Sequence, residues 1–360
     1  MEANFDLLIA GCNTRCKHCY VNGRPGKRMA LKDALLCIEK LDAIAAALPF
    51  SCSFTLDNEP INHPDIAEIL RAASSVKKIH HFHHGMTTGI ALMQRSDREA
   101  VIKSYLDCGC TEFGITLHGS AEHHDEIVRR SGAHKTSMET AAFFRAQGAD
   151  LSVSLMLNRF FATDAAQIDQ AIEELQPGFI WFAIPNYTPH KNMPAFEAYR
   201  ASFPMLEGLS AYLQKWGQDV PALLERARQG TPGSVMTQLV QGPSLIARFR
   251  APQEELYLSV HPDCQLYLGN TGVETACLGD FRFIDVAHAA ELICSTPGNR
   301  DYGAFYDVAA LPSQDALMQV LQQLPQDRLY EDAASVIYRG LSALNTPTRI
   351  LAYDTDSTCS

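Results

Sequence analysis

Three cysteines follow one another within eight residues near the start of the chain, at Cys12, Cys16 and Cys19. Thiolates are soft ligands that suit zinc and iron–sulfur clusters. A structural zinc site normally closes with four protein ligands, and the nearby candidate, His18, is poorly spaced to join its neighbours on one ion. Three thiolates suit a four-iron cluster in which one iron has no protein ligand and stays open to a small molecule. The spacing favours the cluster over zinc.

Composition sets the class of protein in which this loop must work. The 360 residues are 46% hydrophobic and 20% charged, which allows one large domain, or a large and a small one. A net charge of -11 argues against a nucleic-acid partner. No apolar run approaches the roughly 20 residues of a membrane span, and the first residues do not resemble a secretory signal. We therefore expect a cytoplasmic protein whose eleven cysteines are thiols or metal ligands, not disulfides.

Apolar strand-like runs alternate with helical periodicities through the first half of the chain. The strands are expected at Phe5–Ala10, Ser53–Leu56, Lys78–Phe82, Glu112–Leu117, Leu151–Leu157 and Phe179–Ile184. The helices between them are expected at Leu31–Leu48, Pro64–Ala73, Asp97–Leu106, Ser137–Gln147 and Ala165–Leu175. This order predicts an α/β fold, a partial (β/α)6 barrel with helices outside a parallel sheet. The cysteines follow the first strand, so they lie at the carboxyl ends of the strands, where such barrels place their chemistry.

The motif Cx3CxΦC, with His18 at the aromatic position Φ and the first strand before it, resembles the signature of the radical S-adenosylmethionine superfamily. That resemblance implies a [4Fe-4S] cluster held by Cys12, Cys16 and Cys19, and S-adenosylmethionine as the second cofactor. It also implies reductive cleavage of S-adenosylmethionine to a 5′-deoxyadenosyl radical that takes a hydrogen atom from a substrate.

Later strand ends extend the resemblance to about Pro185. The segment "LDNEPINHPD" is similar to the family's GGEP element, with Asp57 and Asn58 in the glycine positions and Glu59 facing the methionyl amine. Side chains in place of the glycines predict a less tightly turned loop, or one that uses Asn58 itself as a ligand. A fourth-strand segment resembles that of sulfatase-maturing and peptide-modifying enzymes, in which an arginine, here Arg129 or Arg130, grips the cofactor carboxylate. The cofactor contacts that the resemblance implies are His18, Tyr20, Asn58, Glu59, Pro60, Thr88, Thr116, Arg129, Arg130 and Asn158.

The histidine-rich segment "HHFHHG" does not read as a metal site, because alternate residues of a strand face opposite sides. We expect His83 or His84 to contact substrate there, where an imidazole can act as an acid or base. Residues 1–194 are expected to form the barrel and residues 195–250, which four prolines divide, a helical cap or bridge.

Residues 251–360 resemble the α+β SPASM or twitch extension, which in that branch of the superfamily holds auxiliary clusters. Gly272 and Cys277 match part of its motif, with Cys264 before them and Cys294 after. A closed cluster needs about four converging soft ligands. These three cysteines are spread over 31 residues with no CxxC pair, so we expect no auxiliary cluster.

The resemblance implies a small-molecule or peptide substrate and an electron donor such as flavodoxin or ferredoxin. Epimerisation, dehydrogenation, rearrangement and cross-linking all stay open, as in natural-product or peptide modification. Because no domain precedes the first strand, a fused cobalamin or leader-binding module is not expected at that end. The alternative is a non-catalytic iron–sulfur or zinc protein that keeps the barrel as a binding module.

Overall fold

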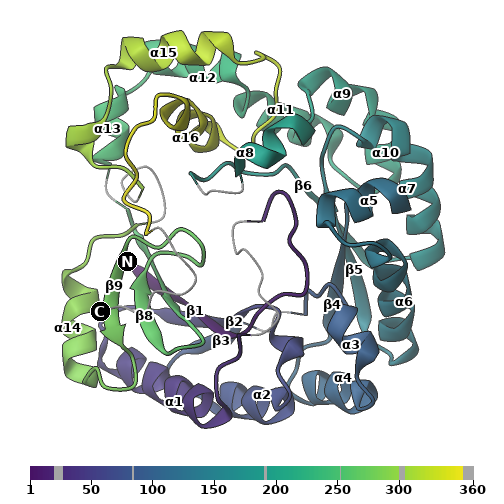
Figure 1. Cartoon of the computed structure of the whole chain (residues 1–360), viewed down its shortest axis with the longest axis vertical. Coiled ribbons are helices and arrows are strands. Elements are labelled where there is room, and N and C mark those ends of the chain that lie inside the picture. The colour runs from purple at the N-terminus through teal and green to yellow at the C-terminus, as the bar shows by residue number, and fades with distance from the viewer. Residues whose placement is uncertain (20–26, 83–84, 190–192, 252, 300–304, 352–360) are drawn as a thin grey trace.

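Six strands alternate with helices through the first half of the chain, as Figure 1 shows. The computed structural model describes residues 1–19, 27–82, 85–189, 193–251, 253–299 and 305–351. Its first six strands are β1 (Glu2–Ala10), β2 (Cys52–Asn58), β3 (His80–Phe82), β4 (Glu112–Leu117), β5 (Asp150–Met156) and β6 (Phe179–Ala183). The helices that accompany them are α1 (Leu31–Ala47), α2 (Ile66–Ser75), α3 (Ile90–Gln94), α4 (Arg98–Asp107), α5 (Ala121–Val128), α6 (Ala133–Ala146) and α7 (Phe161–Leu175). The predicted α/β alternation is confirmed.

The strands turn their apolar residues toward the outer helices. In β1, Phe5 and Leu7 are buried in the core cluster that includes Leu41 and Ile44 of α1. Alternate residues of a strand face opposite sides. Asn4 and Asp6 therefore face away from the helices, toward the inside of the barrel.

The barrel wall is made of two sheets. One has the order β3-β2-β1-β7-β8-β9 and the other the order β4-β5-β6. Among the described residues, a parallel bridge between Met86 and Gly114 joins them. A side chain at Gly114 would place its Cβ only 2.0 Å from the Met86 sulfur, so glycine permits this close approach.

The predicted C-terminal hairpin adds to the barrel wall. It consists of β7 (Glu255–Val260) and β8 (Gln265–Leu268), followed by β9 (Ala276–Asp280) and α14 (Val286–Ser295). Strand β7 pairs in parallel with β1 and antiparallel with β8. The sheet thus runs across the predicted division between residues 1–194 and 251–360, which stays a prediction.

Short helices complete the ring of elements between β6 and the hairpin (Figure 1). They are α8 (Met193–Phe196), α9 (Phe203–Gly208), α10 (Ser210–Lys215), α11 (Val220–Gln229), α12 (Pro232–Gln241), α13 (Leu245–Phe249), α15 (Gln314–Gln323) and α16 (Ala333–Ala343), with the 3-10 turns η2 (Glu197–Tyr199) and η3 (Val308–Ala310). The 3-10 turn η1 (Pro60–Asn62) follows β2. Prolines stand in the first turns of α9, α11 and α12, where their missing N–H costs little. Within the described ranges, no helix is both long and apolar enough to span a bilayer.

Candidate active site

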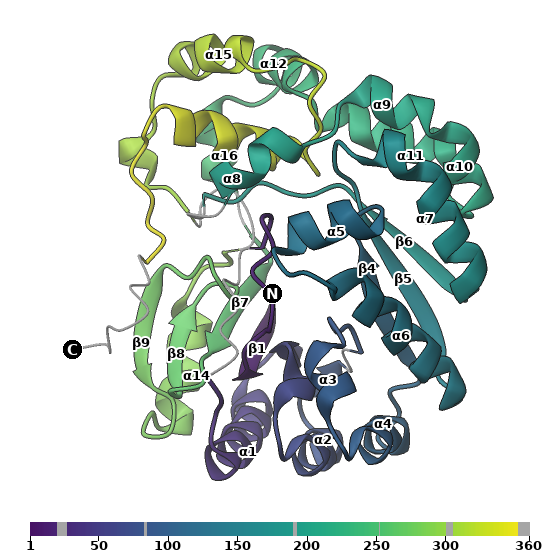
Figure 2. The same ribbon diagram turned by 45° about the vertical axis from the view of Figure 1, so that its right-hand side comes forward.

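The cysteine loop leaves and re-enters the fold at the carboxyl end of β1. Gly11 N–H donates to the Lys27 carbonyl over 3.1 Å, and Met29 N–H donates to the Ile9 carbonyl over 2.9 Å. A bridge between Ala10 and Arg28 lies between these bonds. These contacts join the two ends of the loop, residues 9–11 and 27–29, which we call the loop base. In Figures 1 and 2 its described part, coloured dark purple, lies inside the ring of strands and helices.

Two buried side chains after β2 hold this base. Asn62 Nδ2 donates to the Gly11 carbonyl over 2.6 Å, and His63 Nε2 lies 2.8 Å from the Met29 carbonyl. Both residues are almost fully buried. The element after β2 thus fixes both strands of the loop base, a role that the sequence alone did not reveal.

The thiols of the loop share a small space. Cys12 Sγ lies 3.2 Å and Cys16 Sγ 3.5 Å from the same Thr14 hydroxyl oxygen. Cys19 N–H donates to the Cys16 carbonyl over 3.1 Å in a tight turn. Burial raises the pKa of Cys16 to about 12, with a further contribution from Cys19. Burial and the Glu59 charge also raise the pKa of Cys12.

Glu59 connects the cysteine loop to the segment after β3. Its carboxylate is buried and accepts hydrogen bonds from the Thr87 hydroxyl and, over 3.0 Å, from Thr88 N–H. The Cys12 thiol lies 3.6 Å from Glu59 Oε2. Burial raises the pKa of Glu59 to about 7, although these hydrogen bonds oppose the shift. The structure brings together the predicted residues Cys12, Glu59 and Thr88.

One residue of the GGEP-like element, Asn58, has a backbone conformation that is typical of glycine. Asn58 has a φ of 73°, in the left-handed region that glycine favours and asparagine tolerates. Pro60 stands at the start of η1, directly after Glu59. The predicted loosening of this turn is therefore not required at Asn58, because its backbone adopts the glycine conformation.

Contacts from α5 and the segment after β6 hold the outer side of the loop. Arg130 donates to the Asn13 carbonyl over 3.1 Å, whereas Arg129 is exposed in a left-handed conformation at the end of α5. Lys17 Nζ bonds to Glu126 over 2.9 Å and to the Tyr199 hydroxyl. Of the two candidate arginines, Arg130 is the one that contacts the cysteine loop.

The remaining predicted contacts are dispersed. Asn158 is fully buried and donates to the His118 carbonyl over 2.7 Å, so it joins two strand ends. Thr116 lies in β4, paired with Ser154 of β5. The His18 ring packs against His118 and Phe196, and burial, assisted by Arg200, lowers its pKa to about 4. Tyr20, His83 and His84 lie outside the described residues.

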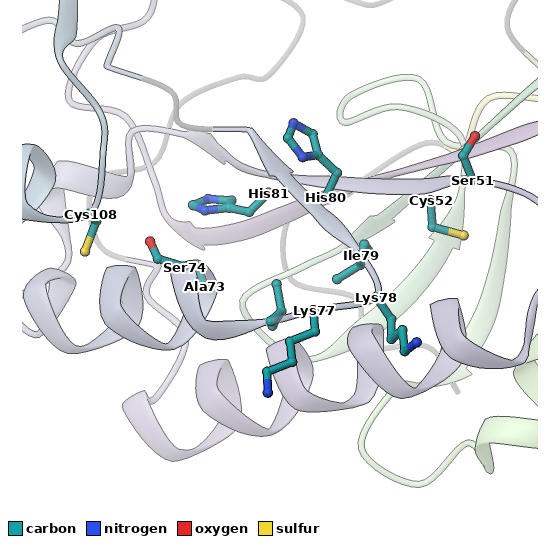
Figure 3. A pocket seen from close by; sticks show the side chains of 11 residues that line it. Ser51, Cys52, Ala73, Ser74, Lys77, Lys78, Ile79, His80, His81 and Cys108 are labelled. Carbon is teal, nitrogen blue, oxygen red and sulfur yellow. The ribbon is translucent and has the colours of Figure 1, made fainter.

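A surface hollow of about 520 Å³ lies away from this site. Figure 3 shows its lining, contributed by the starts of β2 and β3, the end of α2 and Cys108. These residues lie at the amino ends of the strands, whereas catalytic groups of such barrels gather at the carboxyl ends. The hollow and the cysteine loop are therefore at opposite ends of the barrel wall.

The donor set of the loop suits a four-iron cluster. Cys12 and Cys16 meet at one hydroxyl and Cys19 is one turn away, so three soft ligands come from a single short segment. In the described ranges no three histidine, cysteine or acidic side chains already stand in a metal-holding arrangement. The thiols would exchange their present hydrogen bonds for metal bonds.

The C-terminal cysteines have separate surroundings. The buried Cys264 interacts with Cys37 of α1. Cys277 Sγ lies 3.6 Å from Gln265 Oε1, and Cys294 is exposed on α14. Each of the three thus has its own environment.

Comparison with known proteins identifies the domain that this geometry belongs to. The model of the radical SAM superfamily matches residues 7–165. Residues 7–165 form a radical SAM domain. The cofactors expected from the sequence, a [4Fe-4S] cluster and S-adenosylmethionine, are those of this superfamily, and the radical SAM domain confirms the prediction of an enzyme. No curated protein matches it by sequence.

Solved radical SAM structures share its fold across most of the chain. The structure titled native anSMEcpe with bound AdoMet and Cp18Cys peptide is 12% identical, with a TM-score of 0.52, over 95% of this chain and 96% of that one. SuiB of Streptococcus suis bound to S-adenosylmethionine is 11% identical, with a TM-score of 0.52, over 92% of this chain and 76% of that one. At these identities the likeness shows the fold.

Proposed function

We propose that Cys12, Cys16 and Cys19 hold the cluster of this radical SAM enzyme and that Glu59 binds the methionyl amine of S-adenosylmethionine. The observation that carries the proposal is the contact between Cys12 and Glu59, 3.6 Å apart although 47 positions separate them in sequence. A residue suited to the cluster thus touches a residue suited to the cofactor. When bound, the two cofactors together supply the reductive cleavage that starts hydrogen abstraction.

The residues around Glu59 would orient and hold the cofactor. A buried carboxylate whose pKa lies near 7 gains a favourable partner when an ammonium group arrives. Thr88 N–H and the Thr87 hydroxyl fix the direction of the carboxylate. Asn58 and Pro60 would shape the turn beside the amine. Arg130, which donates to the Asn13 carbonyl of the cysteine loop, would bind the cofactor carboxylate. His18, Tyr20, Thr116, Arg129 and Asn158 stay proposed contacts.

The substrate is proposed to be a peptide or a small molecule, with His83 or His84 among its contacts. Peptides are favoured by two neighbours: one is anSMEcpe with a bound Kp18Cys peptide, and the other is SuiB bound to its precursor peptide SuiA, with TM-scores of 0.51 each. Epimerisation, dehydrogenation, rearrangement and cross-linking each begin with hydrogen abstraction. The electron donor would be a flavodoxin or ferredoxin in the cytoplasm.

The test is formation of 5′-deoxyadenosine by anaerobically reconstituted protein with dithionite and S-adenosylmethionine. Wild type should form it, and the Cys12→Ala/Cys16→Ala/Cys19→Ala variant should not. The matched control, Cys264→Ala/Cys277→Ala/Cys294→Ala, removes as many thiols from the hairpin region and should keep the activity. Wild-type protein that holds about four irons but forms no nucleoside would favour the non-catalytic alternative.

A further inference from the structure

The inner face of the barrel wall carries acidic groups next to the proposed cofactor site. Asp6 of β1 and Asp57 of β2 occupy positions that alternate with the apolar residues packed on α1. Ser259 of β7 pairs with Asp6 in the parallel register. Asp57 directly precedes Asn58 and Glu59, so this face continues to the strand end that meets the cysteine loop.

Asp6 is held in place by the loop between β8 and β9. The Thr271 N–H and hydroxyl donate to Asp6 Oδ2 over 3.2 and 3.3 Å. The charged groups that act on Asp6 are the carboxylates of Asp57 and Glu274, and both disfavour its ionised form. Together with burial, which is the largest cause, they raise the pKa of Asp6 to about 7.

Glu274 brings a second buried carboxylate to the same place. It has 0% exposure. Its Oε1 lies 2.7 Å from His261 Nε2 and 3.4 Å from the Ser259 hydroxyl oxygen. Its Oε2 is buried and accepts no hydrogen bond from any described residue. A buried carboxylate oxygen without a donor is costly, so Glu274 Oε2 calls for a donor from beyond the described residues.

The backbone around Glu274 is built for this placement. Gly269 has a φ of 119°, and a Cβ there would lie 2.9 Å from Glu274 Cα. The loop therefore folds tightly back over β7 and β1, which lie side by side in Figure 2. Leu351 N–H donates to the Glu274 carbonyl over 2.8 Å and fixes the loop from the C-terminal side.

We propose that Asp6, Asp57 and Glu274, which we call the acidic wall, bind a positively charged nitrogen of the substrate. The inference rests on the proposed function and names the substrate class as one that carries an ammonium or guanidinium group. His261 bonds to Glu274, and the charged groups that act on Asp6 are themselves carboxylates. A cationic donor would therefore supply both the hydrogen bond that Glu274 Oε2 lacks and charge compensation.

The probe is n-butylammonium, with 1-butanol as an uncharged compound of similar shape. Each is added to reconstituted holoenzyme, and the melting temperature is measured for wild type and for Asp6→Asn/Glu274→Gln. A ligand that binds only the folded state raises the melting temperature. Wild type should respond to the amine at least three times as strongly as Asp6→Asn/Glu274→Gln does. 1-Butanol should raise the melting temperature of either protein no more than the amine raises that of Asp6→Asn/Glu274→Gln.

The matched control is Glu68→Gln/Glu99→Gln, which removes two carboxylates from exposed positions of α2 and α4. It should respond to the amine as wild type does. The proposal for the acidic wall would be wrong if the amine raised the melting temperatures of wild type and Asp6→Asn/Glu274→Gln equally. It would also be wrong if 1-butanol raised the melting temperature of wild type as much as the amine does. If the double variant does not fold, Asp6→Asn alone replaces it, because its amide oxygen can still accept the Thr271 bonds.

A second measurement separates ligand binding from a structural role. Without probe, Asp6→Asn should melt at the same temperature as wild type or higher, because it removes repulsion among buried carboxylates. A lower melting temperature would show that ionised Asp6 serves the fold and would contradict the inference. Formation of 5′-deoxyadenosine by the same wild-type preparation reports on the proposed function separately.

Discussion

The two groups of three cysteines differ in how the chain holds them. Cys12 and Cys16 meet at one hydroxyl and Cys19 follows within a turn, on a loop whose base is bonded to Asn62 and His63. In the hairpin region, by contrast, Cys264 faces α1 and Cys294 is exposed on α14. The first group thus has a backbone that neighbouring elements hold in place, which the cysteines of the hairpin region do not share.

Glu59, the proposed partner of the methionyl amine, contacts Cys12 of the first group, and its replacement should have the strongest effect. Glu59→Ala should weaken S-adenosylmethionine binding by about 1.5–3 kcal/mol, or roughly 10- to 150-fold, because a charge-assisted bond is lost. Iron content should stay unchanged. Equilibrium dialysis of reconstituted protein measures the affinity, with Cys264→Ala as the control that leaves it unaltered. Unchanged affinity in Glu59→Ala would move the amine contact to Asn58 or elsewhere.

Asn62 tests whether the base of the loop is what distinguishes the first group. Asn62→Ala removes the 2.6 Å bond to the Gly11 carbonyl and should lower the free energy of unfolding by about 1–3 kcal/mol. Iron uptake during reconstitution should also be less complete. Denaturant titration and iron analysis measure the two effects. Full stability together with full iron uptake would show that the base does not need this side chain.

Asn58 gives a smaller effect of backbone origin. The φ of Asn58 is 73°, which alanine adopts only at a cost. Asn58→Ala should therefore lower the free energy of unfolding by about 1–2 kcal/mol, whereas Asn58→Gly should leave it nearly unchanged. Denaturant titration of the two variants side by side provides the measurement. Equal losses would mean that the amide side chain matters more than the left-handed backbone.

The smallest expected effect is in the second group. Cys264→Ala should cost about 1 kcal/mol of stability, because it removes a buried sulfur that packs near Cys37. Its iron content should equal that of wild type. Loss of iron in this variant would give Cys264 a metal role and erase the contrast between the groups.

Sequence periodicity predicted the alternating strands and helices because each buries a regular apolar face, as Phe5 and Leu7 do in β1. The family resemblance, and not periodicity, pointed to Cys12, Glu59 and Thr88 as residues for the cluster and cofactor. They lie close together because parallel strands bring their carboxyl ends to one edge. The roles of Asn62 and His63 were missed, because a side chain that bonds a distant carbonyl leaves no periodic signal. The pairing of β7 with β1 was also missed, because the partner of an edge strand depends on tertiary packing and leaves no periodic signal either.

Iron analysis of Cys12→Ala/Cys16→Ala/Cys19→Ala after anaerobic reconstitution shows whether these three thiols hold the cluster. The account predicts about four irons per wild-type chain and close to none in the variant, because a single cluster is held by one group of cysteines. About four residual irons that disappear when Cys264 and Cys277 are also replaced would contradict it and would make the protein a two-cluster enzyme.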